Sequence, residues 1–110
     1  ENTSEWLKDI IRRDARGPVS IDTIQNTVAD YFNMTVADLL SSKRTSDLAM
    51  ARQIAMYLCR KVTDSSLQQV GTAFRKKDHT TVLHAHRKIS QMVKEQPRIK
   101  QIVDSIEGKL

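Results

Sequence analysis

The sequence predicts an all-α domain of six or seven helices that contains a helix-turn-helix, and three observations support this class. Apolar residues recur at the spacing of amphipathic helices, and no segment alternates as a half-buried strand does. Polar residues suited to helix caps precede most of these segments. The 110 residues include only three glycines and two prolines, as expected for helices joined by short turns. This length suits one compact domain.

The N-terminal segment is expected to be a short connector. Residues 5–13 place four large apolar side chains on one helical face, namely Trp6, Leu7, Ile10 and Ile11. The sequence Arg16-Gly17-Pro18 then breaks the helix, and the composition changes. We therefore expect a boundary near residue 18, with the domain over 19–110. Because there is no initiator methionine, we expect a piece of a longer protein.

Two helices are predicted next. Ser20 is a good N-cap for a helix that reaches about residue 32. Its inward positions are Ile21, Ile24, Val28 and Phe32. Asn33 can adopt a left-handed conformation and end this helix. Thr35 and Asp38 fit a capping box, which predicts a short helix ending at about residue 40.

A polar loop over 41–47 precedes a longer helix, predicted from about 47 to 62. Its inward stripe comprises Ala51, Ile54, Ala55, Leu58 and Val62. We expect Arg52, Arg60 and Lys61 to lie off that stripe. Cys59 is the only cysteine, which rules out an internal disulfide, and it is expected to be a small core residue.

Three further helices complete the prediction. A capping box, either Ser65 with Gln68 or Ser66 with Gln69, opens a short helix over about 67–74. A basic turn, Arg75-Lys76-Lys77, follows. Asp78 can cap a helix over about 79–94, and Pro97 suits the first turn of a last helix over 97–107.

The charge is concentrated in the middle of the chain. The whole chain carries +5, whereas residues 41–94 contain eleven basic and three acidic side chains. A positive region on a small domain suits a polyanionic partner, because binding releases counterions from phosphates. A basic face that is only solvated would have the same composition, so charge alone does not distinguish it from a polyanion-binding region.

Segment 66–94 has the layout of a helix-turn-helix, whose second helix places its N-terminal residues near base edges in the major groove. At that N-terminus stand Asp78, His79, Thr80 and Thr81, whose side chains are able to read bases. The basic turn beside them could reach phosphates. Two-helix motifs are common, so this pattern alone is not decisive.

Four stretches resemble the DNA-binding domain of the bacterial replication initiator DnaA. Asp78-His79-Thr80-Thr81-Val82-Leu83-His84-Ala85 looks like the signature of this family. Arg52-Gln53-Ile54-Ala55-Met56-Tyr57-Leu58 resembles the family's preceding helix. Residues 24–29 and 36–41 also match, so the resemblance spreads in order over about 19–94.

The resemblance implies a C-terminal, Trp-repressor-like helical domain that binds double-stranded origin repeats of the TTATCCACA kind. It implies a bacterial protein of the cytoplasm and nucleoid. Residues 1–18 then correspond to the end of an ATPase lid and a connector helix. Nothing in the chain resembles the phosphate loop of that ATPase module, so we expect no nucleotide cofactor and no enzymatic activity in this piece.

The resemblance also carries over individual roles. It implies that Asp78, His79 and Thr80 read bases in the major groove and that Arg44 enters the adjacent minor groove. Leu67 and Gln68 occupy positions that touch bases or backbone, although the family often has proline where this chain has Gln68. The expected phosphate contacts are Arg52, Gln53, Arg60, Lys76, Lys77 and Thr81.

Some of the same residues also bear on other functions. His79, His84 and His86 are five and two residues apart, which does not gather them as metal ligands on one helical face, so we expect no metal site. A protein-docking module for a replication regulator and a transcription-factor domain both stay open. Residues 5–13 could touch acidic phospholipid or pack on a neighbouring module. On DNA we expect a monomer.

Overall fold

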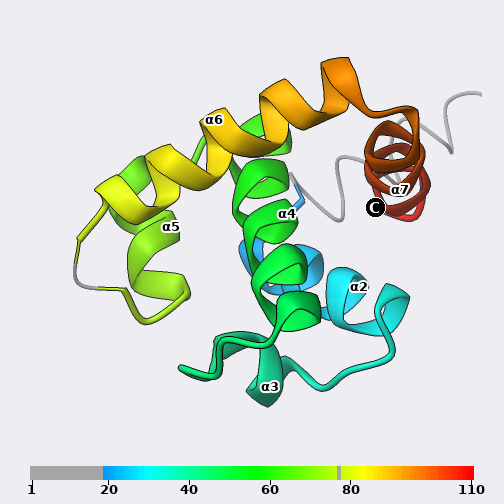
Figure 1. Ribbon diagram of the computed structural model, residues 1–110. Helices are drawn as coiled ribbons and strands as arrows, with labels where there is room; N and C mark the ends of the chain where they lie inside the picture. Colours follow the sequence, from blue (N-terminus) through cyan, green and yellow to red (C-terminus); the bar gives the residue numbers. More distant parts are fainter. Residues whose placement is uncertain (1–18, 77) are drawn as a thin grey trace, which may run out of the picture.

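The computed structural model describes residues 19–76 and 78–110, which form six α-helices and no strand over those two ranges (Figure 1). The helices are α2 (Ile21–Tyr31), α3 (Val36–Leu40), α4 (Ser46–Val62), α5 (Leu67–Ala73), α6 (Thr80–Glu95) and α7 (Pro97–Glu107). This confirms the predicted all-α class. The connector helix expected over 5–13 lies outside the described residues, and so does Lys77.

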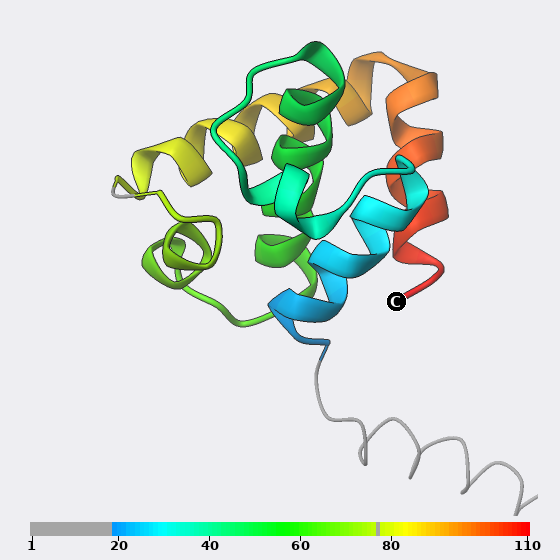
Figure 2. The same ribbon diagram turned by 90° about the horizontal axis from the view of Figure 1, so that it is seen from below.

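Helix α4 is the centre of the domain and contacts all five other described helices. Figure 1 shows α6 crossing α4, with α5 beside the N-terminal half of α6 and α7 beside its C-terminal end. Figure 2 shows α2 and α3 packed against α4 from the other side. Because α4 is covered on several sides, Met56 and Tyr57 are buried in addition to Cys59 and the predicted stripe, of which only Val62 is half-buried.

Predicted caps account for where three of the helices begin. The hydroxyl oxygens of Ser20 and Thr35 accept the backbone N–H three residues later, at 3.2 and 3.0 Å. The capping box of α5 uses Ser66 and Gln69, at 3.1 and 2.8 Å, so the second of the two sequence alternatives is confirmed. Asn33 has the expected left-handed backbone, with φ 58°.

Two predicted helix starts differ from the structure by one residue. Helix α4 begins at Ser46 rather than at residue 47, because the Thr45 hydroxyl accepts the N–H of Leu48 at 3.4 Å and so caps the helix earlier. Helix α6 begins at Thr80 rather than at residue 79, so its N-cap is His79 and not the predicted Asp78, whose carboxylate accepts the N–H of Thr80 from the position before the cap.

The prediction that Arg52 lies off the buried face of α4 was wrong. Only 7% of Arg52 is exposed, and it is one of two buried polar residues in the described ranges. Its guanidinium reaches three backbone carbonyls in the last turn of α3 and the loop that follows it, and these supply the partners that a buried charge requires.

Candidate nucleic-acid interface

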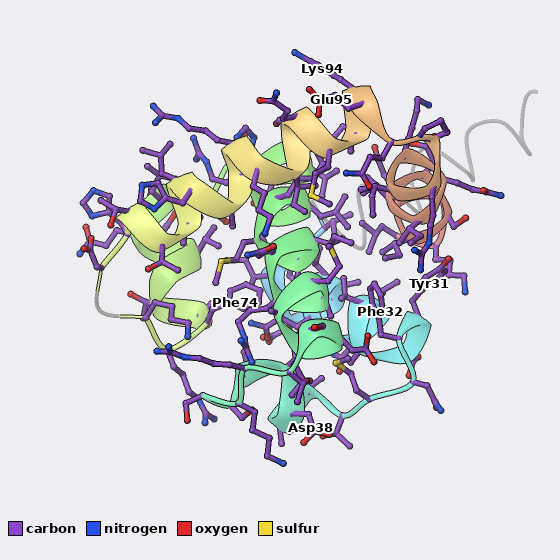
Figure 3. The ribbon with its side chains drawn as sticks, in the orientation of Figure 1. Tyr31, Phe32, Asp38, Phe74, Lys94 and Glu95 are labelled. Carbon is purple, nitrogen blue, oxygen red and sulfur yellow. The ribbon has the colours of Figure 1, made fainter. Side chains whose placement is uncertain are left out.

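Helix α5 ends in a tight turn that aims the chain into α6. The N–H of Lys76 donates to the carbonyl of Gly71 at 2.8 Å, and the N–H of Arg75 donates to that of Thr72 at 3.0 Å. This is the bonding of a Schellman motif, in which the residue after the cap is left-handed. Arg75 fills that position with φ 60°, although glycine is the usual residue there. The side chain of Phe74, which lies between α5 and α4 in Figure 3, is fully buried just before the turn.

The N-terminus of α6 presents short polar side chains to solvent. Asp78, His79 and Thr81 are exposed, and Thr80 is half-buried. The Asp78 carboxylate accepts the N–H of Thr80 at 3.0 Å, and this backbone bond is the main reason that the pKa of Asp78 is lowered. Asp78 is therefore ionised at neutral pH. The His79 ring makes no capping bond, which leaves it available to a ligand.

A hollow of about 270 Å³ is lined by the N-terminal half of α4, by Lys76 and by α6, which packs across α4. Its lining comprises Ala49, Arg52, Gln53, Met56, Lys76, Thr81, His84, Ala85 and Lys88. Four of these residues were predicted phosphate contacts: Arg52, Gln53, Lys76 and Thr81. The fold thus brings side chains from three segments to one concave site with several cations and N–H donors, a composition that suits a phosphate group.

His84 and Lys88 complete this hollow, and neither is among the DNA contacts predicted from the sequence. A signal for them existed. They are four residues apart on α6, and His84 is three residues after Thr81, so all three share one face of that helix.

Arg44 lies in the loop between α3 and α4, and its side chain is exposed. In Figures 1 and 2 this loop and the α5–α6 turn project on the same side of α4. The two predicted points of base contact, Arg44 and the N-terminus of α6, are therefore presented to the same side.

Arg52 donates hydrogen bonds to the end of α3 and to this loop. Its Nε donates to the carbonyl of Leu39 at 2.8 Å, and its Nη2 donates to those of Ser41 and Lys43 at 2.9 and 3.2 Å. Burial lowers the pKa of Arg52 from its ordinary value. A contact with a phosphate was the only role expected of this residue, so its hydrogen bonds to the loop are a new observation.

Arg60 lies away from the hollow. It donates to the carbonyl of Ser65. Burial, and to a smaller extent the Arg60 charge, lowers the pKa of His86. The His86 ring packs against the ring of Tyr57, with 5.3 Å between the centroids. None of Arg60, His86 and Tyr57 lines the hollow, so the structure does not bring Arg60 to the other predicted phosphate contacts.

The first turn of α5 holds two further predicted residues. Leu67 is half-buried against the core, and Gln68 is exposed. In the ranges that the structure describes, no three His, Cys, Asp or Glu side chains form a group able to hold a metal ion. No helix in the described part of the chain is long and apolar enough to cross a membrane.

Comparison with known families identifies this arrangement. Residues 21–89 match the family described as the bacterial DnaA protein helix-turn-helix. This chain belongs to that family. The match includes α2 to α5 and the first ten residues of α6, and therefore the whole hollow and the exposed N-terminus of α6. The DnaA helix-turn-helix is a DNA-binding module of replication initiation, and the resemblance seen in the sequence is confirmed.

Solved structures agree with this assignment. A crystal structure of a DNA replication initiation factor is 39% identical, with a TM-score of 0.73 over 96% of this chain. The replication initiator DnaA bound to AMPPCP and single-stranded DNA is 35% identical, with a TM-score of 0.67 over 93% of this chain. The chain spans 31% of each of these proteins.

Proposed function

We propose that this DnaA domain binds double-stranded DNA sequence-specifically at replication-origin repeats of the TTATCCACA kind, as part of a protein that initiates and regulates chromosome replication. The observation that carries the proposal is the exposed Asp78-His79-Thr80 terminus of α6 beside a hollow lined by cations. Residues 19–110 form the DNA-binding domain, and residues 1–18 are the connector. The test is a comparison of such a duplex with a scrambled one.

Base reading in the major groove is assigned to the N-terminus of α6. The ionised Asp78 can accept a hydrogen bond from the amino group of cytosine. The His79 ring can donate to N7 or O6 of guanine, and the Thr80 hydroxyl can donate or accept. Leu67 and Gln68, at the start of α5, flank this contact and reach base methyl groups or the backbone.

Arg44 is assigned to the minor groove. A narrow, A·T-rich minor groove has enhanced negative potential, which attracts a guanidinium. Support comes from the exposure of Arg44 and from its loop lying on the same side of α4 as the α5–α6 turn. Two separate base contacts from one chain would set the orientation of the domain, so one domain binds one repeat as a monomer.

The remaining polar residues hold phosphates. The hollow offers Gln53, Lys76, Thr81 and Lys88 to one strand, and Lys77 is assigned beside them by its place in the chain. Arg60 contacts the DNA backbone at a separate point, away from the hollow. Such contacts fix the register without reading sequence.

Replacing Lys88 with glutamine tests the role of the hollow. We expect the affinity for the TTATCCACA duplex and for a scrambled duplex to fall by the same factor, because a phosphate contact carries no sequence information. The slope of log affinity against log salt should decrease by about one. Fluorescence anisotropy at several salt concentrations measures both quantities.

Lys100→Gln is the matched control, since Lys100 is exposed on α7 and lies outside the hollow. It should leave the slope nearly unchanged. A loss confined to the TTATCCACA duplex in Lys88→Gln would assign Lys88 to base reading, and an unchanged slope would remove it from the interface.

The wider partners belong to the same proposal. The nucleotide-dependent activity of the longer initiator is expected to reside in an ATPase module outside the matched segment. Replication-regulatory proteins would compete for the α6 face. Contact with acidic phospholipid would involve residues 5–13, and co-sedimentation of a 1–18 peptide with anionic vesicles tests it.

A further inference from the structure

Arg52 is buried in α4 and donates all three of its observed hydrogen bonds to the end of α3 and the loop that leads from it to Arg44. The acceptors run from the last turn of α3 into that loop: Leu39 is the last residue but one of α3, Ser41 caps the helix, and Lys43 immediately precedes Arg44. One side chain therefore fixes the path of five consecutive residues.

Arg52 of α4 acts as a cap at the C-terminus of a different helix, α3. The last carbonyls of a helix lack partners within it and attract cations. Helix α3 has no basic residue in its own last turn. Arg52 supplies the missing cation from the next helix, and burial strengthens each bond because water competes less.

Other bonds hold the loop on both sides of Arg44. The Ser41 hydroxyl donates to the carbonyl of Asp38 at 2.7 Å and accepts the N–H of Lys43 at 3.3 Å. Directly after Arg44, Thr45 caps α4. The backbone of Arg44 is thus fixed from both sides, while its side chain stays exposed.

We propose that Arg52 is a positioning residue that holds the α3–α4 loop so that Arg44 is preset for the minor groove. This inference rests on the proposed function and adds a residue to it. A loop ordered before binding loses less conformational entropy when the complex forms. Removing Arg52 should therefore weaken the reading done by Arg44 without removing any group that touches a base.

The test uses a difference in the DNA that only the minor groove shows. In the A·T-rich end of the TTATCCACA duplex, single A·T pairs are replaced either by G·C or by inosine·cytosine. The two replacements are alike in the major groove, but only guanine adds an amino group to the minor groove. The ratio of affinities for the inosine and guanine duplexes thus reports minor-groove reading.

Five proteins are compared: wild type, Arg44→Ala, Arg52→Met, Arg52→Lys and the double variant that combines Arg44→Ala with Arg52→Met. Wild type should prefer the inosine duplex by about tenfold at the contacted pair. Arg44→Ala and Arg52→Met should both bring the ratio close to one, and the double variant should add nothing. Arg52→Lys keeps the charge and a single donor group, so it should give an intermediate ratio, and it carries the test if Arg52→Met is not folded by circular dichroism.

Val103→Ala is the matched control, because it also disturbs a buried side chain but lies in α7. It should keep the wild-type ratio. If folded Arg52→Met and Arg52→Lys both keep that ratio, Arg52 has no positioning role. If wild type prefers the TTATCCACA duplex to a scrambled one but binds the inosine and guanine duplexes equally, minor-groove reading and this inference fail together. If wild type does not prefer the TTATCCACA duplex at all, the proposed function itself fails.

Discussion

Replacing His79 with alanine is expected to lower the affinity for the TTATCCACA duplex by about 5- to 150-fold, which corresponds to roughly 1–3 kcal/mol. His79 is exposed at the start of α6 and makes no capping bond, so its removal takes nothing from the fold. The affinity for a scrambled duplex should stay the same, because binding there depends on phosphates. Parallel titrations of the two duplexes measure the difference.

The control for His79→Ala is Gln91→Ala, an exposed position nearer the C-terminal end of α6. It should bind both duplexes as wild type does. An equal loss on both duplexes for His79→Ala would make His79 a backbone contact. No loss on either would exclude it from the interface and favour a module whose role is protein docking.

Replacing Phe74 with alanine is expected to remove roughly 3–5 kcal/mol of the free energy of unfolding. Phe74 is fully buried where α5 ends, directly before the left-handed Arg75. The cavity would lie under the turn that sets α5 against α6, so specific DNA binding should be lost together with stability. Urea unfolding followed by circular dichroism measures the change.

Phe74→Leu separates packing from the identity of the residue. A hydrophobic side chain of similar volume should cost less than about 1.5 kcal/mol and preserve DNA binding. If Phe74→Ala loses less than about 1 kcal/mol, then Phe74 does not anchor the turn, and the geometry of the motif must depend on other contacts.

Local signals in the sequence predicted most of the fold. Ser20, Thr35 and Ser66 were expected as caps and are caps, because a cap needs only a hydroxyl and a nearby N–H. Asn33 was expected to be left-handed and is. The left-handed backbone of Arg75 was not expected, because the hydrogen bonds that end α5 impose it and arginine has no preference for it.

Contacts between distant segments could not be read in this way. Hydrophobic periodicity assigns a charged residue to the outside, so it missed the burial of Arg52, whose acceptors lie 9 to 13 residues earlier in the chain. Periodicity also predicts one buried stripe for α4, whereas the surrounding helices bury Met56 and Tyr57 as well.

The same distinction, between local signals and contacts of distant segments, applies to the candidate site. Asp78, His79 and Thr80 are adjacent in sequence, and the structure places them together at the start of α6. The hollow gathers Gln53, Lys76 and Lys88 from three separate segments, and only the tertiary packing of α6 across α4 brings them near one another.

The most direct test of the proposed function is fluorescence anisotropy of a labelled TTATCCACA duplex and a scrambled duplex, titrated with the domain at several salt concentrations. We expect a preference of roughly 10³-fold or more for the TTATCCACA duplex, and we expect that preference to persist at physiological salt. Equal binding of the two duplexes that disappears as salt rises would contradict it, because the basic face would then be only electrostatic.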